Sequence, residues 1–239
     1  RSTLFPYTTL FRSASIVWTL HDSWPFCGIC HYFFDCDGYQ KQCGDCPFLH
    51  SGKQNDLSYK AWKRKVELYK DLDLHIISPS RWLADCAKRS SLFGRFPVEV
   101  IPNCLDVETF RPLDESEISP RWREYQERRS EKPFVLYGAV NAATDKIKGF
   151  ANLLSALKIL EKNGHADDFE LIVFGADESE LNMDATIPIH TVGYVGNTKE
   201  LVSLYNLASV MVVPSLTEVF GQTASEALAC GIPVVAFRC

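Results

Sequence analysis

The sequence predicts an α/β protein with parallel sheets, because short apolar runs alternate with amphipathic helical stretches along the chain. The runs are rich in Val and Ile and mostly lack alternating polar residues, which is typical of parallel strands covered on both faces. Strands are expected at residues 15–20, 74–80, 98–103, 133–139, 169–175, 209–215 and 232–237.

Helices are expected between the later strands. Residues 150–164 place Leu153, Leu154, Leu157 and Leu160 at helical spacing and stop at Gly164. Residues 197–208 and 217–231 follow the same pattern. Strand and helix therefore alternate through the second half of the chain, as they do in doubly covered parallel sheets.

Composition excludes several classes of protein. The 239 residues carry a net charge of −5, so no global basic field points to nucleic acid. No apolar run approaches the roughly 20 residues that would span a bilayer. Nine cysteines are many, and five of them fall between Cys27 and Cys46. A secreted scaffold held by disulfides would be small and loop-rich, so the alternating pattern favours a reducing, cytoplasmic setting.

Two charged segments interrupt the pattern. Residues 113–132 are highly charged, with prolines at or near both ends, and we expect a surface stretch and short helix that join two domains. Residues 62–70 are basic and partly amphipathic. They are interpreted as a solvated helix face, with contact to an anionic membrane surface as the alternative.

The segment 214–237 carries the main candidate site. A strand ends at Ser215, a short loop holds Glu218, and the helix that follows carries Glu226. Ligands of open α/β sheets usually sit beyond the carboxyl ends of the strands. The N–H groups at Phe220, Gly221 and Gln222 would start this helix, where free donors and the helix dipole favour phosphate. The alternative is an ordinary helix with solvated acids.

This segment resembles the Glu-x7-Glu motif of retaining nucleotide-sugar glycosyltransferases, in particular glycosyltransferase family 4, which has the GT-B fold. The resemblance rests on Pro214, Ser215, Glu218, Phe220, Gly221, Glu226, Ala227, Gly231, Pro233 and Val234.

Residues 134–157 resemble the first strand and glycine loop of that family's nucleotide-binding domain, with Gly138 in the loop. Lys148 and Gly149 match a Lys-Gly pair whose lysine meets the diphosphate. Ala139 stands where the commonest pattern has arginine, so either Lys146 offers a second positive charge or the site has one. Without the resemblance, a solvated lysine would be the better reading of Lys148, since a cation gains nothing from a helix N-terminus.

The N-terminal half carries weaker matches. Residues 100–112 resemble the stretch that closes the family's first domain, and residues 77–86 resemble the strand-to-helix turn before it, with Ser80 as a good N-cap. Residues 19–33 resemble the strand end at which the family carries a histidine facing sugar and acceptor. His21 is that candidate, and a structural histidine is the alternative.

Four cysteines form a candidate metal site. Cys30, Cys36, Cys43 and Cys46 have the spacing C-x5-C-x6-C-x2-C. Four thiolates can hold tetrahedral Zn²⁺, and the closing C-x2-C is a usual half-site. Cys27 or His31 could replace a ligand, and reduced free cysteines are the alternative. Such a zinc would be structural, because it would have no open position for catalysis.

The resemblance spans residues 14–239 and implies two Rossmann-like domains, both incomplete in this chain. We expect a partial acceptor-side domain at 14–112, a linker at 113–132 and a partial nucleotide-sugar-binding domain at 133–239. Residues 3–13 resemble, codon by codon, the translation of a common sequencing adapter. Residues 1–13 are therefore expected to be a non-native tail.

The resemblance also implies a reaction, in which a sugar moves from a nucleotide-diphosphate sugar to a glycan or lipid-linked acceptor, with retention of configuration. Glu226 would bind the donor ribose and Glu218 the sugar hydroxyls. Lys148 and the helix amides would neutralise the departing diphosphate, so no catalytic metal is expected. Cell-surface polysaccharide synthesis at the inner face of the membrane would suit this activity, and the fragment itself is expected to be inactive.

Three alternatives remain beside this reading. An epimerase would lack the Glu-x7-Glu spacing. A phosphorylase would need a pyridoxal-phosphate lysine, which no segment suggests. A non-enzymatic zinc-loop module would leave the acidic motif unexplained.

Overall fold

A computed structural model describes residues 14–141, 144–176 and 185–238. The expected non-native tail lies outside these residues. The chain forms two compact units, which divide between Asn103 and Cys104. Each unit contains its own parallel sheet, as the sequence predicted. Short 3-10 helices lie at Trp24–Phe26, Gly38–Gln40, Glu115–Glu117, Pro120–Trp122 and Lys146–Lys148.

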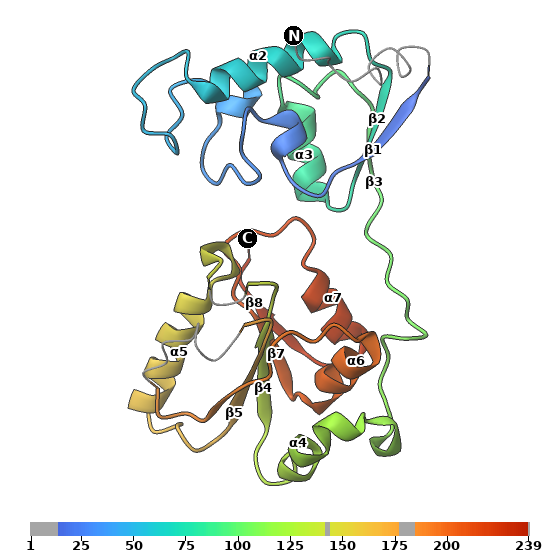
Figure 1. Cartoon of the computed structure of the whole chain (residues 1–239), viewed down its shortest axis with the longest axis vertical. Helices are drawn as coiled ribbons and strands as arrows, with labels where there is room; N and C mark the ends of the chain where they lie inside the picture. Colours follow the sequence, from blue (N-terminus) through green and yellow to red (C-terminus); the bar gives the residue numbers. More distant parts are fainter. Residues whose placement is uncertain (1–13, 142–143, 177–184, 239) are drawn as a thin grey trace, which may run out of the picture. The chain divides into compact units, whose positions relative to one another are not determined.

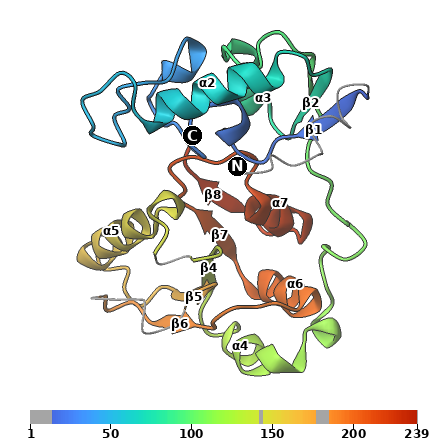
Figure 2. The ribbon, with the colours of Figure 1, turned by 45° about the horizontal axis from the view of Figure 1, so that its top comes forward.

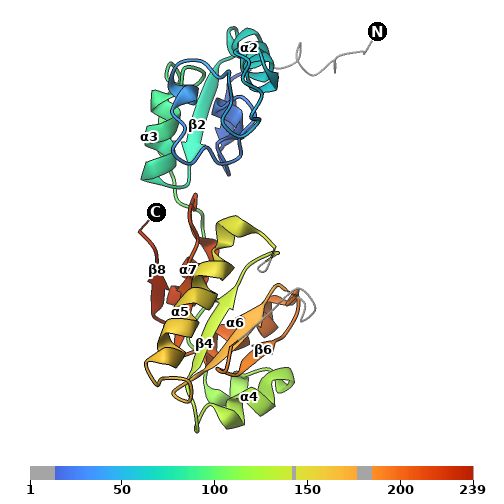
Figure 3. The ribbon, with the colours of Figure 1, turned by 90° about the vertical axis from the view of Figure 1, so that its left-hand side faces the viewer.

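The first unit contains a three-stranded sheet in the order β1-β2-β3. Figure 3 labels the middle strand of this sheet, β2. Its strands are β1 (Ile16–Thr19), β2 (Leu74–Ser78) and β3 (Val98–Val100), and its helices are α2 (Leu57–Tyr69) and α3 (Arg81–Arg89). The Ser80 side chain accepts from the Leu83 amide at 3.3 Å, so the predicted N-cap of α3 is confirmed. Asp56 caps α2 in the same way by accepting from the Tyr59 amide.

The second unit contains a five-stranded parallel sheet in the order β6-β5-β4-β7-β8. It holds β4 (Phe134–Gly138), β5 (Glu170–Phe174), β6 (Ile189–Thr191), β7 (Val210–Val213) and β8 (Val234–Ala236), with helices α4 (Arg123–Arg128), α5 (Phe150–Lys162), α6 (Thr198–Leu207) and α7 (Gln222–Ala229). All strands except β6 lie within the apolar runs. β6 follows its single isoleucine with His190 and Thr191, so it does not appear as an apolar run.

Helices cover both faces of this sheet (Figures 1 and 2). Tyr137, Leu171 and Val173 point to the face that α5 covers. Phe134, Leu136, Ile172 and Phe174 point to the opposite face, where they pack with α6 and α7. Because successive strand residues face opposite sides, both sets must be apolar when both faces are buried. This is why the strands appear as continuous apolar runs.

The expected linker at 113–132 is instead part of the second unit. Trp122 is 2% exposed and donates its indole N–H to the Glu200 carbonyl at 2.9 Å. Arg128 forms an ion pair with Glu170 of β5 at 2.7 Å. Just before the segment, Asn206 of α6 donates to the Arg111 carbonyl. The unit boundary therefore lies before residue 112, because an aromatic anchor within a charged sequence holds the segment to the core.

Candidate active site

A cavity of about 290 Å³ lies where β4 and β7 end, against the first turns of α7. Gly138, Lys148, Glu218, Gln222 and Glu226, all expected at the site from the sequence, line it together. The carboxyl ends of parallel strands are the usual ligand edge of such sheets. The sequence pattern therefore led to one real concavity within the second unit.

Three other expected residues do not line this cavity: Lys146, Phe220 and Gly221. The helix starts at Gln222, slightly later than predicted, so Phe220 precedes it. The first bond of the helix runs from the Ser225 amide to the Gly221 carbonyl. Amides in the turn before Ser225 consequently have no partner within the helix, as at any helix start.

The Lys148-Gly149 pair is placed by a close approach of two loops. Gly149 has φ of 72°, and a Cβ there would collide with the Pro214 carbonyl at the end of the β7 segment. The Leu216 amide donates to the Ile147 carbonyl at 2.8 Å, which joins the same two loops. Glycine is required because any side chain would push the loops apart. Its neighbour Lys148 is thereby held beside the acidic loop.

Lys148 and Glu218 form an ion pair within the cavity. Lys148 Nζ lies 2.7 Å from Glu218 Oε1, and Ser215 Oγ donates to the same oxygen at 3.0 Å. Their side chains are 24% and 20% exposed, so both remain accessible from solvent. The sequence placed Lys148 and Glu218 at one site, although it did not predict that they would touch.

Glu226 is held from two sides. Tyr205 of α6 donates its phenol to Glu226 Oε2 at 2.7 Å, and Gln222 Nε2 donates to Oε1 at 3.3 Å. Tyr205 is fully buried. Burial, followed by the charge of Glu226, raises the pKa of the Tyr205 phenol, which therefore stays protonated as a donor. No pattern in the sequence indicated Tyr205, because an apolar helix face gives no sign of a buried polar contact.

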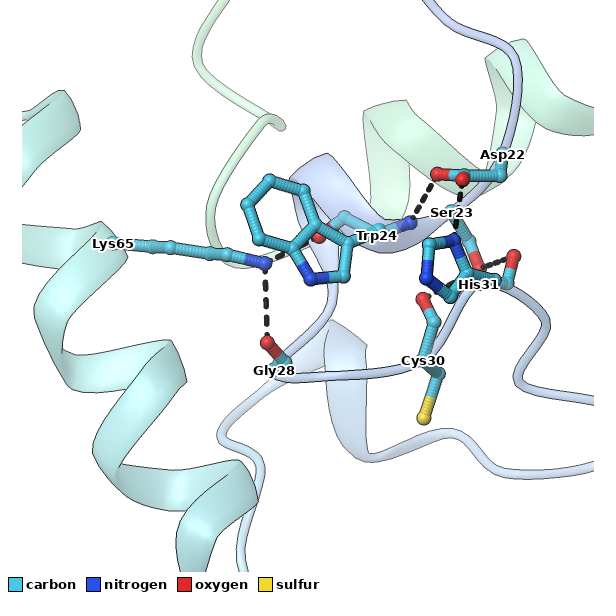
Figure 4. A network of polar contacts seen from close by, with 7 residues as sticks. All are labelled: Asp22, Ser23, Trp24, Gly28, Cys30, His31 and Lys65. Atoms are coloured by element: carbon cyan, nitrogen blue, oxygen red, sulfur yellow. Dashed lines mark hydrogen bonds and ion pairs between the residues drawn. The ribbon is translucent and has the colours of Figure 1, made fainter.

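His21 lies in the first unit, after the carboxyl end of β1, and is exposed. The adjacent Asp22 was not singled out from the sequence. It accepts from the Trp24 amide at 2.8 Å and pairs with His31 Nδ1 at 2.6 Å (Figure 4). His31 is thus engaged with a carboxylate at the start of the loop that carries the cysteines.

The four cysteines of the predicted zinc site are free thiols in the structure. Burial, and after it the nearby Cys46, Cys43 and Cys36 thiols, together raise the pKa of Cys30 to about 12. The thiols therefore lie near enough to influence one another. Among the residues that the structure describes, no group of three or more His, Cys, Asp or Glu side chains is arranged to hold a metal ion. The zinc site stays a prediction.

The family model for glycosyl transferases group 1 matches residues 119–239. WcaC of Escherichia coli K12, assigned to colanic acid biosynthesis as a glycosyl transferase, is 28% identical over 227 residues, which cover 93% of this chain and 51% of WcaC. A D-inositol 3-phosphate glycosyltransferase of Arthrobacter sp. strain FB24 is 29% identical over 149 residues, 59% of this chain and 34% of that protein. The chain therefore spans about half the length of WcaC and less of the second relative.

Solved structures agree on the fold. WaaG, a glycosyltransferase involved in lipopolysaccharide biosynthesis, matches with a TM-score of 0.60 at 17% identity, over 92% of this chain and 55% of WaaG. A UDP-forming trehalose-phosphate synthase from Burkholderia xenovorans matches with a TM-score of 0.64 at 13% identity. The match covers 97% of this chain and 56% of the synthase. The predicted GT-B class is confirmed. In the described part of the chain, no helix has the length and apolarity needed to cross a membrane.

Proposed function

The chain belongs to the glycosyl transferases of group 1, and we propose that it transfers a sugar, with retention, from a nucleotide-diphosphate sugar to a glycan or lipid-linked acceptor. The observation that carries this proposal is the convergence of Lys148, Glu218 and Glu226 on one cavity at the strand ends. The relation to WcaC favours cell-surface polysaccharide synthesis. We place the reaction on the cytoplasmic side, with the enzyme peripheral to the membrane.

Each residue of the cavity has a distinct proposed role. Glu226 accepts hydrogen bonds from the donor ribose, and Glu218 contacts the sugar hydroxyls near the reacting carbon. Lys148 and the free amides at the start of α7 stabilise the negative charge that develops on the departing diphosphate. These groups supply the positive charge, so we expect turnover without a divalent metal. For His21, in the first unit, we propose a role toward the sugar and the acceptor, as the resemblance implies.

The test is kinetic and uses an enzyme that contains this chain. Glu226→Ala removes a charged hydrogen-bond acceptor, worth roughly 1.5–3 kcal/mol. The donor KM should rise about tenfold or more, with a smaller change in kcat. Glu218→Gln should lower kcat by roughly two orders of magnitude and leave nucleotide affinity near wild type, since the lost charge acts mainly in the transition state.

The exposed Glu131→Gln provides the matched control, because it removes a carboxylate from the same unit away from the cavity. Release of free nucleotide from a panel of labelled nucleotide sugars measures turnover. Normal turnover by Glu218→Gln would show that the charge of Glu218 is not needed for the reaction and that the assignment of the site is wrong.

We propose separately that Cys30, Cys36, Cys43 and Cys46 bind a structural zinc ion, on the basis of their spacing in the sequence. Purified protein should contain close to one zinc per chain, and the double change Cys43→Ala and Cys46→Ala should remove it. Elemental analysis of freshly reduced protein gives the answer. Absence of zinc would leave the cysteines as buried or half-buried free thiols.

A further inference from the structure

Tyr205 joins the core of the second unit to the candidate site. Its ring is fully buried and packs edge-on against Phe174 of β5, with ring centroids 6.1 Å apart. Phe110 packs against the same ring at 6.5 Å. A ring held in this way has little freedom to move, so the position of its hydroxyl is set by the packing of α6 on the sheet.

The hydroxyl reaches only one oxygen of Glu226. It donates to Oε2 at 2.7 Å, whereas Oε1 has only the longer contact to Gln222 at 3.3 Å. Tyr205 does not line the cavity, but Glu226 does. One carboxylate oxygen is therefore fixed from the core side. The other accepts a longer bond from the exposed amide of Gln222, which a ligand can displace.

A charged acceptor makes this bond strong. Hydrogen bonds to an ionised group are roughly twice as strong as neutral ones, and shorter. The phenol remains protonated, because burial and the nearby carboxylate both raise its pKa. A fixed donor of this kind restricts the rotation of the carboxylate before any ligand binds, which lowers the entropy lost on binding.

We propose that Tyr205 is a positioning residue, whose phenol orients Glu226 to accept hydrogen bonds from the ribose diol of a nucleoside diphosphate. This inference rests on the proposed role of Glu226 in donor binding. If it holds, Tyr205, a buried residue of α6, affects the affinity for the nucleoside diphosphate without lining the cavity.

Tyr205→Phe tests the inference, because it keeps the ring and its packing and removes only the hydroxyl. Calorimetry would measure the Kd of the chain for UDP, GDP and ADP, and for the 2′,3′-dideoxy form of the nucleotide bound most tightly. Tyr205→Phe should raise the Kd of that nucleotide about tenfold. Its affinity for the dideoxy form should not change, since no diol meets Glu226.

Coupling to Glu226 gives the second readout. Glu226→Ala should weaken the binding of the same nucleotide. The double variant with Tyr205→Phe should bind it no more weakly than Glu226→Ala alone, because the phenol acts through that carboxylate. Tyr69→Phe is the matched control: it also removes the hydroxyl of a buried tyrosine, which donates to the Pro25 carbonyl in the first unit. It should leave nucleotide affinity unchanged.

The outcomes separate the two claims. If Tyr205→Phe lowers the melting temperature but keeps the wild-type Kd, while Glu226→Ala weakens binding, Tyr205 is only structural and the inference is wrong. If Glu226→Ala also binds normally, or the unaltered chain binds none of the nucleotides, the proposed role of Glu226 fails, and the inference fails with it.

Discussion

The ion pair between Lys148 and Glu218 joins two residues with different proposed roles. Lys148 is proposed to meet the diphosphate, and Glu218 the sugar hydroxyls. Both side chains are partly exposed, and pairs of that kind contribute little to stability. In the proposed function, a single ligand that carries both a diphosphate and a sugar would contact both side chains. Glu218 also offsets the unfavourable position of a lysine near the start of a helix. An anionic ligand would compete with Glu218 for the ammonium group.

Lys148→Ala should therefore weaken the binding of nucleoside diphosphates more than the binding of the uncharged nucleoside. Loss of a charged hydrogen bond to phosphate corresponds to about tenfold or more in Kd. The affinity for the uncharged nucleoside should change little, because it lacks the group that Lys148 meets. Calorimetric titration of both ligands checks this. Lys162→Ala, an exposed lysine at the end of α5, is the control. Equal weakening of nucleoside and diphosphate would contradict the assignment.

At the scale of elements, the loop after β1 shows how a segment without long regular structure is held. The carbonyls of five successive residues, 24 to 28, each accept from a buried side chain. Lys65 of α2 donates to the carbonyls of Trp24, Cys27 and Gly28, and its ammonium lies 3.7 Å from the centre of the Trp24 ring (Figure 4). Tyr69 donates to the Pro25 carbonyl and Ser90 to the Phe26 carbonyl.

Buried backbone groups must be paired, and here side chains pair the carbonyls that neither the short 3-10 helix nor a sheet satisfies. The loop directly follows His21 and Asp22, so the side chains that pair its carbonyls also fix the position of those two residues. Burial lowers the pKa of Lys65 to about 8, so at pH 7 the side chain is still mostly a charged donor.

Lys65→Met should destabilise the first unit clearly. Methionine fills similar space but leaves three buried carbonyls without their donor, and one unsatisfied buried group costs about 1–3 kcal/mol. We expect a loss of roughly 2–4 kcal/mol in the free energy of unfolding, measured by chemical denaturation. Lys60→Met, on an exposed position of α2, should change it by less than about 0.5 kcal/mol. Similar values for the two variants would mean that water replaces the ammonium at no cost.

The elements also show what the sequence could and could not predict. Parallel strands that are buried on both faces leave a strong signal, because both faces must be apolar, and β4 and β5 were found in this way. The segment around Trp122 was misassigned because charged neighbours hide a single buried aromatic anchor. The contact between Tyr205 and Glu226 joins two helices that are distant in sequence, and no local pattern records such a pairing.

At the scale of the whole molecule, the division at residue 104 separates two sets of packed residues. Both described apolar cores of the second unit, one on each face of the sheet, consist only of residues from 104 onward. The segment from Phe110 to Tyr125 belongs to one of them. The sequence predicted two domains from the resemblance, but it placed the end of the first at residue 112, where the chain already packs on the second unit.

Residues 104–239 should accordingly fold alone and keep the donor site. Their five-stranded sheet has helices on both faces, so little apolar core depends on the first unit. The isolated segment should unfold in one cooperative transition and bind nucleoside diphosphate within roughly threefold of the intact chain, a difference below about 1 kcal/mol. A segment starting at residue 133, the boundary expected from the sequence, is the informative comparison. It lacks Trp122 and the Arg128 partner of Glu170, so it should be markedly less stable. If instead the two segments were equally stable, residues 104–132 would be a linker after all.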